Sequence, residues 1–92
     1  MIHSIRHKGL RAFFEKGDSS KVQQTHRKRL SIILTILHGA SDLKDLNYPG
    51  SNLHPLKGEL KDFWSISVSG NWRLIFKFTD GDVYDLDYVD YH

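Results

Sequence analysis

Three short segments in the second half of the sequence hold side chains that could move protons or bind a phosphate. His54 and Lys57 lie in the segment His54-Pro55-Leu56-Lys57, Arg73 lies in the second, and the third is Asp90-Tyr91-His92. An imidazole titrates near neutral pH, and His92 neighbours the carboxylate of Asp90 as well as its own, so it suits a general acid or base. The alternative for His92 is a frayed chain end without a chemical role.

Taken together, these residue types suit the cleavage of RNA by phosphoryl transfer. That reaction needs a base for the 2′-hydroxyl, an acid for the leaving 5′-oxygen and cations for the pentavalent phosphate. Each residue also has an ordinary explanation, with Arg73 and Lys57 as surface cations and His54 as a loop residue. The reaction requires no metal, because the substrate supplies its own nucleophile.

Other kinds of site are not indicated, and we expect neither a metal nor a cofactor. The sequence has no glycine-rich phosphate loop, no H-E-x-x-H and no G-x-S-x-G. Its six histidines lack the spacing of metal ligands, and the absence of cysteine excludes disulfides and thiolate zinc sites. No stretch approaches the roughly 18 apolar residues of a membrane span, so we expect a cytoplasmic protein without a membrane partner.

The charges are unevenly spread over a chain whose length of 92 residues suits a single domain, residues 1–92. Residues 1–29 hold eight Lys and Arg against Glu15 and Asp18, whereas residues 80–92 hold five Asp and no Lys or Arg. This arrangement favours either a cationic face for a polyanion or two solvated surfaces that offset each other.

Two helices are predicted to support the polar segments. The first begins at Lys8 and stops at Gly17, after an alternating segment 1–6 that indicates a short edge strand. The second covers residues 21–38, between a capping box of Ser20 and Gln23 and a terminal Gly39. Lys21, Lys28 and Arg29 lie nearly opposite its apolar stripe, which consists of Val22, His26, Leu30, Ile33, Leu34 and Leu37.

Two positions on the second helix allow more than one interpretation. We interpret His26 as a half-buried spacer at the edge of the core. Ile32 lies on the basic side, so either the sheet and a loop cover it or it is exposed for a partner.

After a loop over residues 40–53, the hydrophobic period becomes two, which predicts a three-stranded antiparallel meander and an α+β fold. Three-residue loops at 69–71 and 80–82 would bring its apolar rows to one face and place Lys77 opposite Asp85. Those rows are Trp64, Ile66 and Val68, then Trp72, Leu74, Phe76 and Phe78, then Tyr84, Leu86 and Tyr88. The other face would carry Arg73 opposite Val89, with Tyr91 opposite Asn71.

Four parts of the sequence resemble the HigB branch of the RelE-like toxins of bacterial toxin–antitoxin systems. They are Met1-Ile2-His3-Ser4 with His7-Lys8-Gly9-Leu10, Leu53-His54-Pro55-Leu56-Lys57-Gly58, Trp64-Ser65-Ile66-Ser67-Val68 followed by Asn71-Trp72-Arg73, and Asp90-Tyr91-His92. The resemblance implies a microbial-RNase fold in the order β-α-α-β-β-β, with two N-terminal helices packed on an antiparallel sheet.

The resemblance also implies an activity and partners. Such a toxin cuts mRNA in the A site of the 70S ribosome, and a HigA-like antitoxin neutralises it and carries the complex to operator DNA. His92 would be an acid/base group, with Asp90 and Tyr91 shaping its position or the mRNA path. His54 and Lys57 would serve in acid/base and charge roles, and Arg73 would stabilise the scissile phosphate. The helices would contact 16S rRNA through the basic residues Lys8, Arg11, Lys21, Lys28 and Arg29.

Two other functions remain open at this stage. One is a non-enzymatic protein of the same fold that occupies the ribosome or gyrase without cutting. The other is a degenerate toxin that acts only as an operon corepressor. The combination of His54, Lys57, Arg73 and His92 favours the nuclease, because a gyrase-directed relative would not be expected to assemble it.

Overall fold

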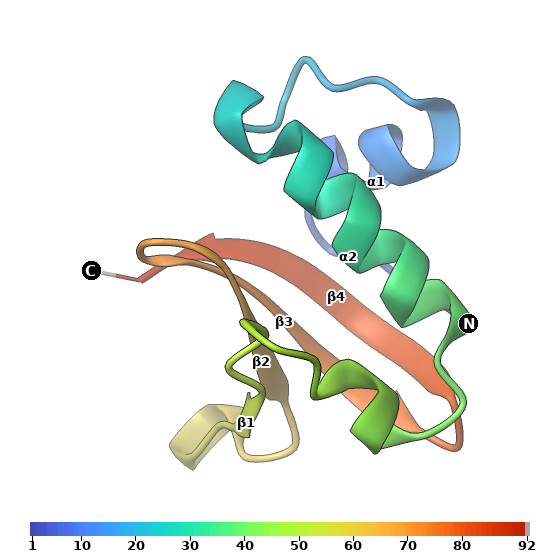
Figure 1. Ribbon diagram of the computed structural model, residues 1–92, viewed down its shortest axis with the longest axis vertical. Helices are drawn as coiled ribbons and strands as arrows, with labels where there is room; N and C mark the ends of the chain where they lie inside the picture. Colours follow the sequence, from blue (N-terminus) through green and yellow to red (C-terminus); the bar gives the residue numbers. More distant parts are fainter. Residues whose placement is uncertain (92) are drawn as a thin grey trace.

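An antiparallel sheet with two α-helices against one face makes up residues 1–91, the part of the chain that the computed structural model describes (Figure 1). The helices are α1 (Lys8–Lys16) and α2 (Arg27–Gly39). The strands are β1 (His54–Pro55), β2 (Trp64–Ser69), β3 (Trp72–Thr79) and β4 (Asp82–Asp90), and they lie side by side in that order. This arrangement confirms the predicted α+β fold.

The predicted strand over residues 1–6 is present only as two isolated bridges. Ile2 pairs with Val83 and Ile5 with Leu86, both parallel to β4. The amide of His3 donates to the carbonyl of Val83 at 2.8 Å, and that of Arg6 to the carbonyl of Leu86 at 2.7 Å. The segment therefore covers the free edge of β4 without becoming a regular strand.

Both helices lie where the periodicity places them, but the second begins later than predicted. In α1, Nδ1 of His7 accepts the amide of Leu10 at 3.0 Å, and Gly17 ends the helix in the left-handed conformation with φ 72°. The predicted capping box at Ser20 is wrong, because Gln23 has extended backbone angles and Asp18 Oδ1 accepts the amide of Ser20. A short 3₁₀ turn over Gln24–His26 precedes α2, which starts at Arg27.

The apolar stripe of the second helix is nevertheless buried, as predicted. Val22 and His26 reach the core from the turn before α2, and the remaining members reach it from α2 itself; these are Leu30, Ile33, Leu34 and Leu37. His26 is more deeply buried than expected, with 6% of its surface exposed. Ile32 is 55% exposed, so neither the sheet nor a loop covers it.

The β3–β4 hairpin corrects the predicted loop length. Trp72 to Ile75 pair with Asp90 to Asp87 in the predicted register, but the register then shifts by one residue, and Thr79 pairs with Asp82. The connection is thus the two-residue turn Asp80-Gly81, compensated by a bulge at Asp85, whose φ is 54°. As a result Val83 is buried and Tyr84, predicted in the core, is 39% exposed.

The β2–β3 hairpin differs in the same manner. Trp64 to Ser67 pair with Phe76 to Arg73 as predicted, but Ser69 pairs with Trp72 across the two-residue turn Gly70-Asn71. Because each bulge restores the register away from the turn, Ile66, Leu74, Phe76, Leu86 and Tyr88 still share the face that packs on the helices. We call this the inner face.

Gly9 determines how closely the segment after α1 approaches that helix. A Cβ at Gly9 would collide with the Cβ of Lys21 and lie 3.0 Å from its carbonyl oxygen. We therefore expect Gly9→Ala to lower the free energy of unfolding by about 1–3 kcal/mol, the usual cost of overpacking. Urea unfolding measures this, with Gly39→Ala as control because its Cβ would have no neighbour within 4 Å. Equal stability of the two variants would contradict the close approach.

Buried His26 makes stability depend on pH. Burial lowers the pKa of His26 below its ordinary value of 6.5, and Nδ1 lies 2.5 Å from the Tyr88 hydroxyl. His26 in the unfolded chain thus binds a proton more readily than buried His26 does. The stability contributed by the neutral, buried His26 is therefore complete above pH 6.5 and is lost as the pH falls toward the lowered pKa. We expect the wild type to lose more stability than His26→Gln between pH 7.5 and 5.5 in urea unfolding. Tyr88→Phe, which keeps the imidazole buried, should retain the wild-type pH dependence.

Candidate functional site

The face of the sheet turned away from the helices brings together residues from all four strands. Cross-strand pairs place His54 opposite Ser65, Ser65 opposite Ile75 and Ile75 opposite Asp87. The next row contains Ser67, Arg73 and Val89. Directly paired residues point to the same side of a sheet, so these side chains share one face, which we call the outer face. Ser65 and Ile75 are buried within it.

His54 is oriented by the loop that precedes β1. Its Nδ1 lies 2.9 Å from the carbonyl oxygen of Asn52, which can only accept, so Nδ1 carries the proton. In the neutral imidazole the other nitrogen, Nε2, is then a proton acceptor. Pro55 keeps His54 in extended backbone, and the side chain is half-buried. The arrangement leaves a nitrogen that can accept a proton at the edge of the outer face.

Arg73 is tied to the β2–β3 turn. Its Nη1 donates to the carbonyl of Gly70 at 2.6 Å and to that of Trp72 at 3.0 Å. A guanidinium has five N–H donors, and its remaining donors have no partner within residues 1–91. Arg73 is thus held at one end while part of its planar fork stays available to an anion such as a phosphate.

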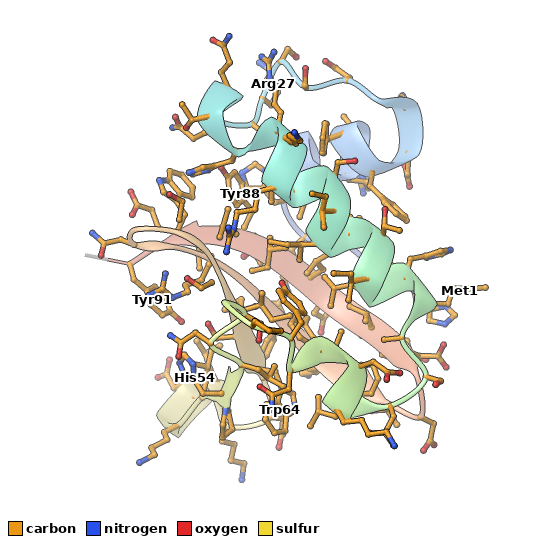
Figure 2. The ribbon with its side chains drawn as sticks, viewed as in Figure 1. Met1, Arg27, His54, Trp64, Tyr88 and Tyr91 are labelled. Atoms are coloured by element: carbon orange, nitrogen blue, oxygen red, sulfur yellow. The ribbon has the colours of Figure 1, made fainter. Side chains whose placement is uncertain are left out.

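The other predicted site residues lie around these two. Lys57 is exposed and follows β1, directly before the short 3₁₀ turn Gly58–Leu60. Tyr91 is 39% exposed, and its amide donates to the carbonyl of Asn71 at 2.8 Å, as the predicted pairing requires. Figure 2 shows Tyr91 and His54 on the same side of the molecule. His92 lies outside the described residues.

Asp90 does not join the outer face. It pairs with Trp72, so its side chain leaves the sheet on the inner side, at the edge of β4. Asp87 is not among the predicted site residues, although the register that places Val89 opposite Arg73 also places Asp87 in the row of His54. Its half-buried carboxylate is the acidic group of that row.

At the far end of the outer face, two cations share one carboxylate. Asp85 Oδ2 lies 3.7 Å from Lys77 Nζ and 3.7 Å from Arg6 Nη2, so the predicted Lys77–Asp85 contact exists although the bulge pairs Lys77 with Tyr84. Both cations also lie over the ring of Phe63. Among the described residues of this face, Arg73 is the cation that has no carboxylate partner.

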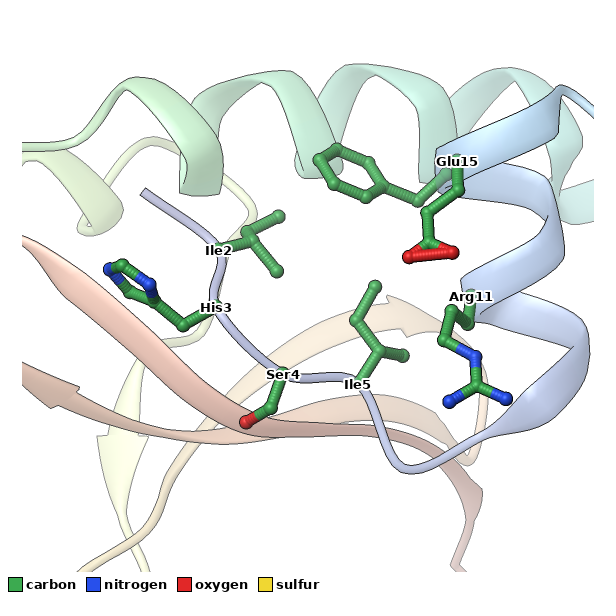
Figure 3. A pocket seen from close by; sticks show the side chains of 7 residues that line it. Ile2, His3, Ser4, Ile5, Arg11 and Glu15 are labelled. Atoms are coloured by element: carbon green, nitrogen blue, oxygen red, sulfur yellow. The ribbon is translucent and has the colours of Figure 1, made fainter.

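The basic residues of the helical layer lie elsewhere. Lys8, Arg11, Lys21, Lys28 and Arg29 are all exposed, on or next to α1 and α2. Arg11 lines a hollow of about 260 Å³ between α1 and the N-terminal segment, with Glu15 beside it (Figure 3). The structure therefore does not bring these residues to His54 and Arg73, and a large polyanion would have to contact both sides of the molecule.

Residues 1–91 hold neither a cluster of metal ligands nor a helix fit to span a membrane. No group of three or more His, Asp or Glu residues there could hold a metal ion. Within the same range, no helix combines the length and the hydropathy that crossing a bilayer requires.

Comparison with solved structures shows that the fold is shared with a known protein. The crystal structure of a mutant of YafQ from E. coli superimposes with a TM-score of 0.61, covering 96% of this chain and 92% of that chain, at 22% sequence identity. This likeness extends over nearly the whole chain and shows a shared fold, two helices on an antiparallel sheet.

Sequence comparison then gives the family. The model of the RelE-like toxin HigB of type II toxin–antitoxin systems matches residues 3–92. The chain is also 45% identical to the protein named endoribonuclease HigB of Proteus vulgaris, over the full length of both. The chain belongs to the HigB-like toxin family.

Proposed function

We propose that this chain is an mRNA endonuclease that cleaves within the ribosomal A site and so arrests translation. The observation that carries this proposal is the placement of His54 and Arg73 in adjacent rows of the outer face. The family, and the name endoribonuclease borne by a relative that is 45% identical over the whole chain, support the same function.

The proposed reaction is attack of a ribose 2′-hydroxyl on the adjacent phosphate. One acid/base group removes the 2′ proton, the bond from phosphorus to the 5′-oxygen breaks, and a second group protonates that oxygen, which leaves a 2′,3′-cyclic phosphate. His54 and His92 are the two proposed groups, and the geometry of His54 leaves Nε2 as the reacting nitrogen. The roles of acid and base stay unassigned between them.

The remaining residues are proposed to act through charge and position. Arg73 would stabilise the negative charge that grows on the pentavalent phosphate, and the exposed ammonium of Lys57 would add to this. Tyr91 would guide the RNA past the β2–β3 turn. Asp90, from the inner side of the sheet, would help to position His92. Because the substrate carries the nucleophile, we propose that the reaction needs no metal.

The proposed partners follow from the same function. A cytoplasmic toxin of this kind would bind 16S rRNA through Lys8, Arg11, Lys21, Lys28 and Arg29, which are exposed on the helical layer. A HigA-like antitoxin would neutralise it and would carry the complex to operator DNA.

The function is tested by mapping cleavage on a defined mRNA. The purified chain is incubated with the mRNA, with and without ribosomes stalled at a known codon, and the new 5′ ends are located by primer extension. We expect cuts in the A-site codon that require the ribosome and disappear with His92→Ala. Ribosome binding without cuts would overturn the nuclease in favour of a binding-only inhibitor. If the protein neither bound nor cut, gyrase or the operon would be the remaining target.

A further inference from the structure

A hollow of about 360 Å³ lies on the helical side of the molecule, where the turn before α2 meets β3 and β4. It is within the size range of ligand pockets, about 300–1,000 Å³. Lys21, Gln23, Gln24 and Arg27 form one wall, and Trp72 and Tyr88 form another. Neither the fold nor the proposed cleavage uses these side chains together.

The groups around the hollow are mostly donors. Lys21 brings an ammonium, Arg27 a guanidinium, and the two glutamines bring amides, whereas no carboxylate among residues 1–91 lines it. The Nε atom of Arg27 is buried without a hydrogen-bond partner there. A buried donor that lacks a partner is costly unless a ligand or water satisfies it, so the site favours an anion.

His7 adds a donor to this set. Its Nδ1 accepts the amide of Leu10 at 3.0 Å, so the neutral ring carries its proton on Nε2. The ring stands edge-on to Tyr88, with centroids 5.3 Å apart, and lines the same hollow.

The aromatic wall is built from rings that pack on one another. Trp72 and Tyr88 have ring centroids 4.5 Å apart, and His26 packs edge-on against Trp72 at 5.6 Å. Tyr88 is nearly buried, whereas Trp72 is partly exposed and so provides the accessible aromatic surface. Aromatic rings next to basic side chains are the usual means of holding a base and its phosphate.

We propose that this hollow binds one nucleotide of RNA, with the base against Trp72 and the phosphate between Lys21 and Arg27. The proposal rests on the proposed function, since it takes RNA as the ligand, and it adds a contact outside the outer face. Gly9 supports the site, because its missing side chain allows Lys21 to lie against α1.

The position of Trp72 connects the hollow to the outer face. Trp72 and Arg73 are consecutive in β3, so their side chains leave the sheet on opposite sides. Both lie directly after the exposed turn Gly70-Asn71, at the end of the sheet. An RNA strand that passes around this turn can therefore contact Arg73 on one side and the hollow on the other.

The fluorescence of Trp72 tests the proposal without measuring cleavage. In Trp64→Phe, Trp72 is the only tryptophan, and it is titrated with a single-stranded 2′-O-methyl RNA pentanucleotide, which cannot be cleaved. We expect quenching, with affinity falling about tenfold in Lys21→Ala and in Arg27→Gln, because each removes a charged hydrogen bond. The control is Lys44→Ala, an exposed lysine outside the hollow, which should keep the affinity. If Trp64→Phe does not fold, the Trp72 indole N–H resonance of the wild type serves instead, assigned with Trp72→Phe.

Two results would overturn the proposal. One is the absence of any Trp72 response at millimolar RNA, and the other is a response that Lys21 and Arg27 do not affect. Because cleavage on ribosomes is measured separately, either result would leave the proposed function standing.

A second experiment identifies the source of the nucleotide. The Lys21→Ala/Arg27→Gln variant is bound to ribosomes with and without mRNA. A loss of affinity only on ribosomes that carry mRNA assigns the nucleotide to mRNA, and an equal loss on vacant ribosomes assigns it to rRNA. Wild-type affinity on both would contradict the proposal.

Discussion

Replacing His54 by glutamine is expected to slow mRNA cleavage on stalled ribosomes by about 10²–10⁴-fold, the usual contribution of one acid/base group. The carbonyl of Asn52 fixes the proton on Nδ1, so Nε2 is the nitrogen proposed to exchange a proton with the substrate. Glutamine keeps a polar side chain of similar length but cannot exchange a proton near neutral pH. Single-turnover rates at saturating protein measure the effect separately from binding.

The matched control for His54 is His3→Gln. His3 is an exposed imidazole whose Nε2 lies 2.8 Å from Asp82, next to the Asp80-Gly81 turn. Its replacement should leave the cleavage rate unchanged. A His54→Gln variant within a factor of ten of the wild type would show that His54 is not an acid/base group, whatever its position on the outer face.

Arg73→Ala is expected to lower the cleavage rate by about 10²–10³-fold, comparable to removing one preorganised donor from a developing oxyanion. Its Nη1 is held by the carbonyls of Gly70 and Trp72, so the guanidinium is already ordered before substrate binds. Arg73→Lys should recover only part of the rate, because an ammonium keeps the charge and loses the planar fork.

Lys77→Ala separates a specific role of Arg73 from the general effect of positive charge. Lys77 lies on the same strand and the same face, but Asp85 lies 3.7 Å from its ammonium. We expect its loss to change the rate by less than Arg73→Lys does. Equal losses for Arg73→Ala and Lys77→Ala would indicate that the outer face attracts RNA only through its net charge. Circular dichroism of each variant checks that the β2–β3 turn is intact.

The helices and strands could be predicted because burial imposes a period on them. Leu30, Ile33, Leu34 and Leu37 follow the helical period, and Ile66, Leu74 and Leu86 lie in alternating segments, and all of these are buried. The turns were less predictable. Two-residue turns with compensating bulges place Asp80 and Asp85 at positive φ, a conformation that non-glycine residues adopt only rarely.

The candidate site was predictable where alternation along a strand determines the side of the sheet on which a side chain lies. The pairing of Arg73 with Val89 and the contact of Tyr91 with Asn71 follow from the register of the meander. Asp90 lies on the opposite side for the same reason, because adjacent residues in a strand alternate. The hollow beside Trp72 could not be predicted, since it depends on how the turn before α2 packs against α1 at Gly9.

The bridges between the N-terminal segment and β4 bear on when the fold can form during synthesis. Ser4 bonds to Asp85 across 81 positions, and His26 bonds to Tyr88 across 62. Contacts this distant in sequence delay folding, because the intervening chain must be ordered first. The helices leave the ribosome long before β4, and until then their apolar stripe has no complete sheet to pack on. A growing chain therefore cannot complete the sheet, and with it the outer face, until β4 has emerged.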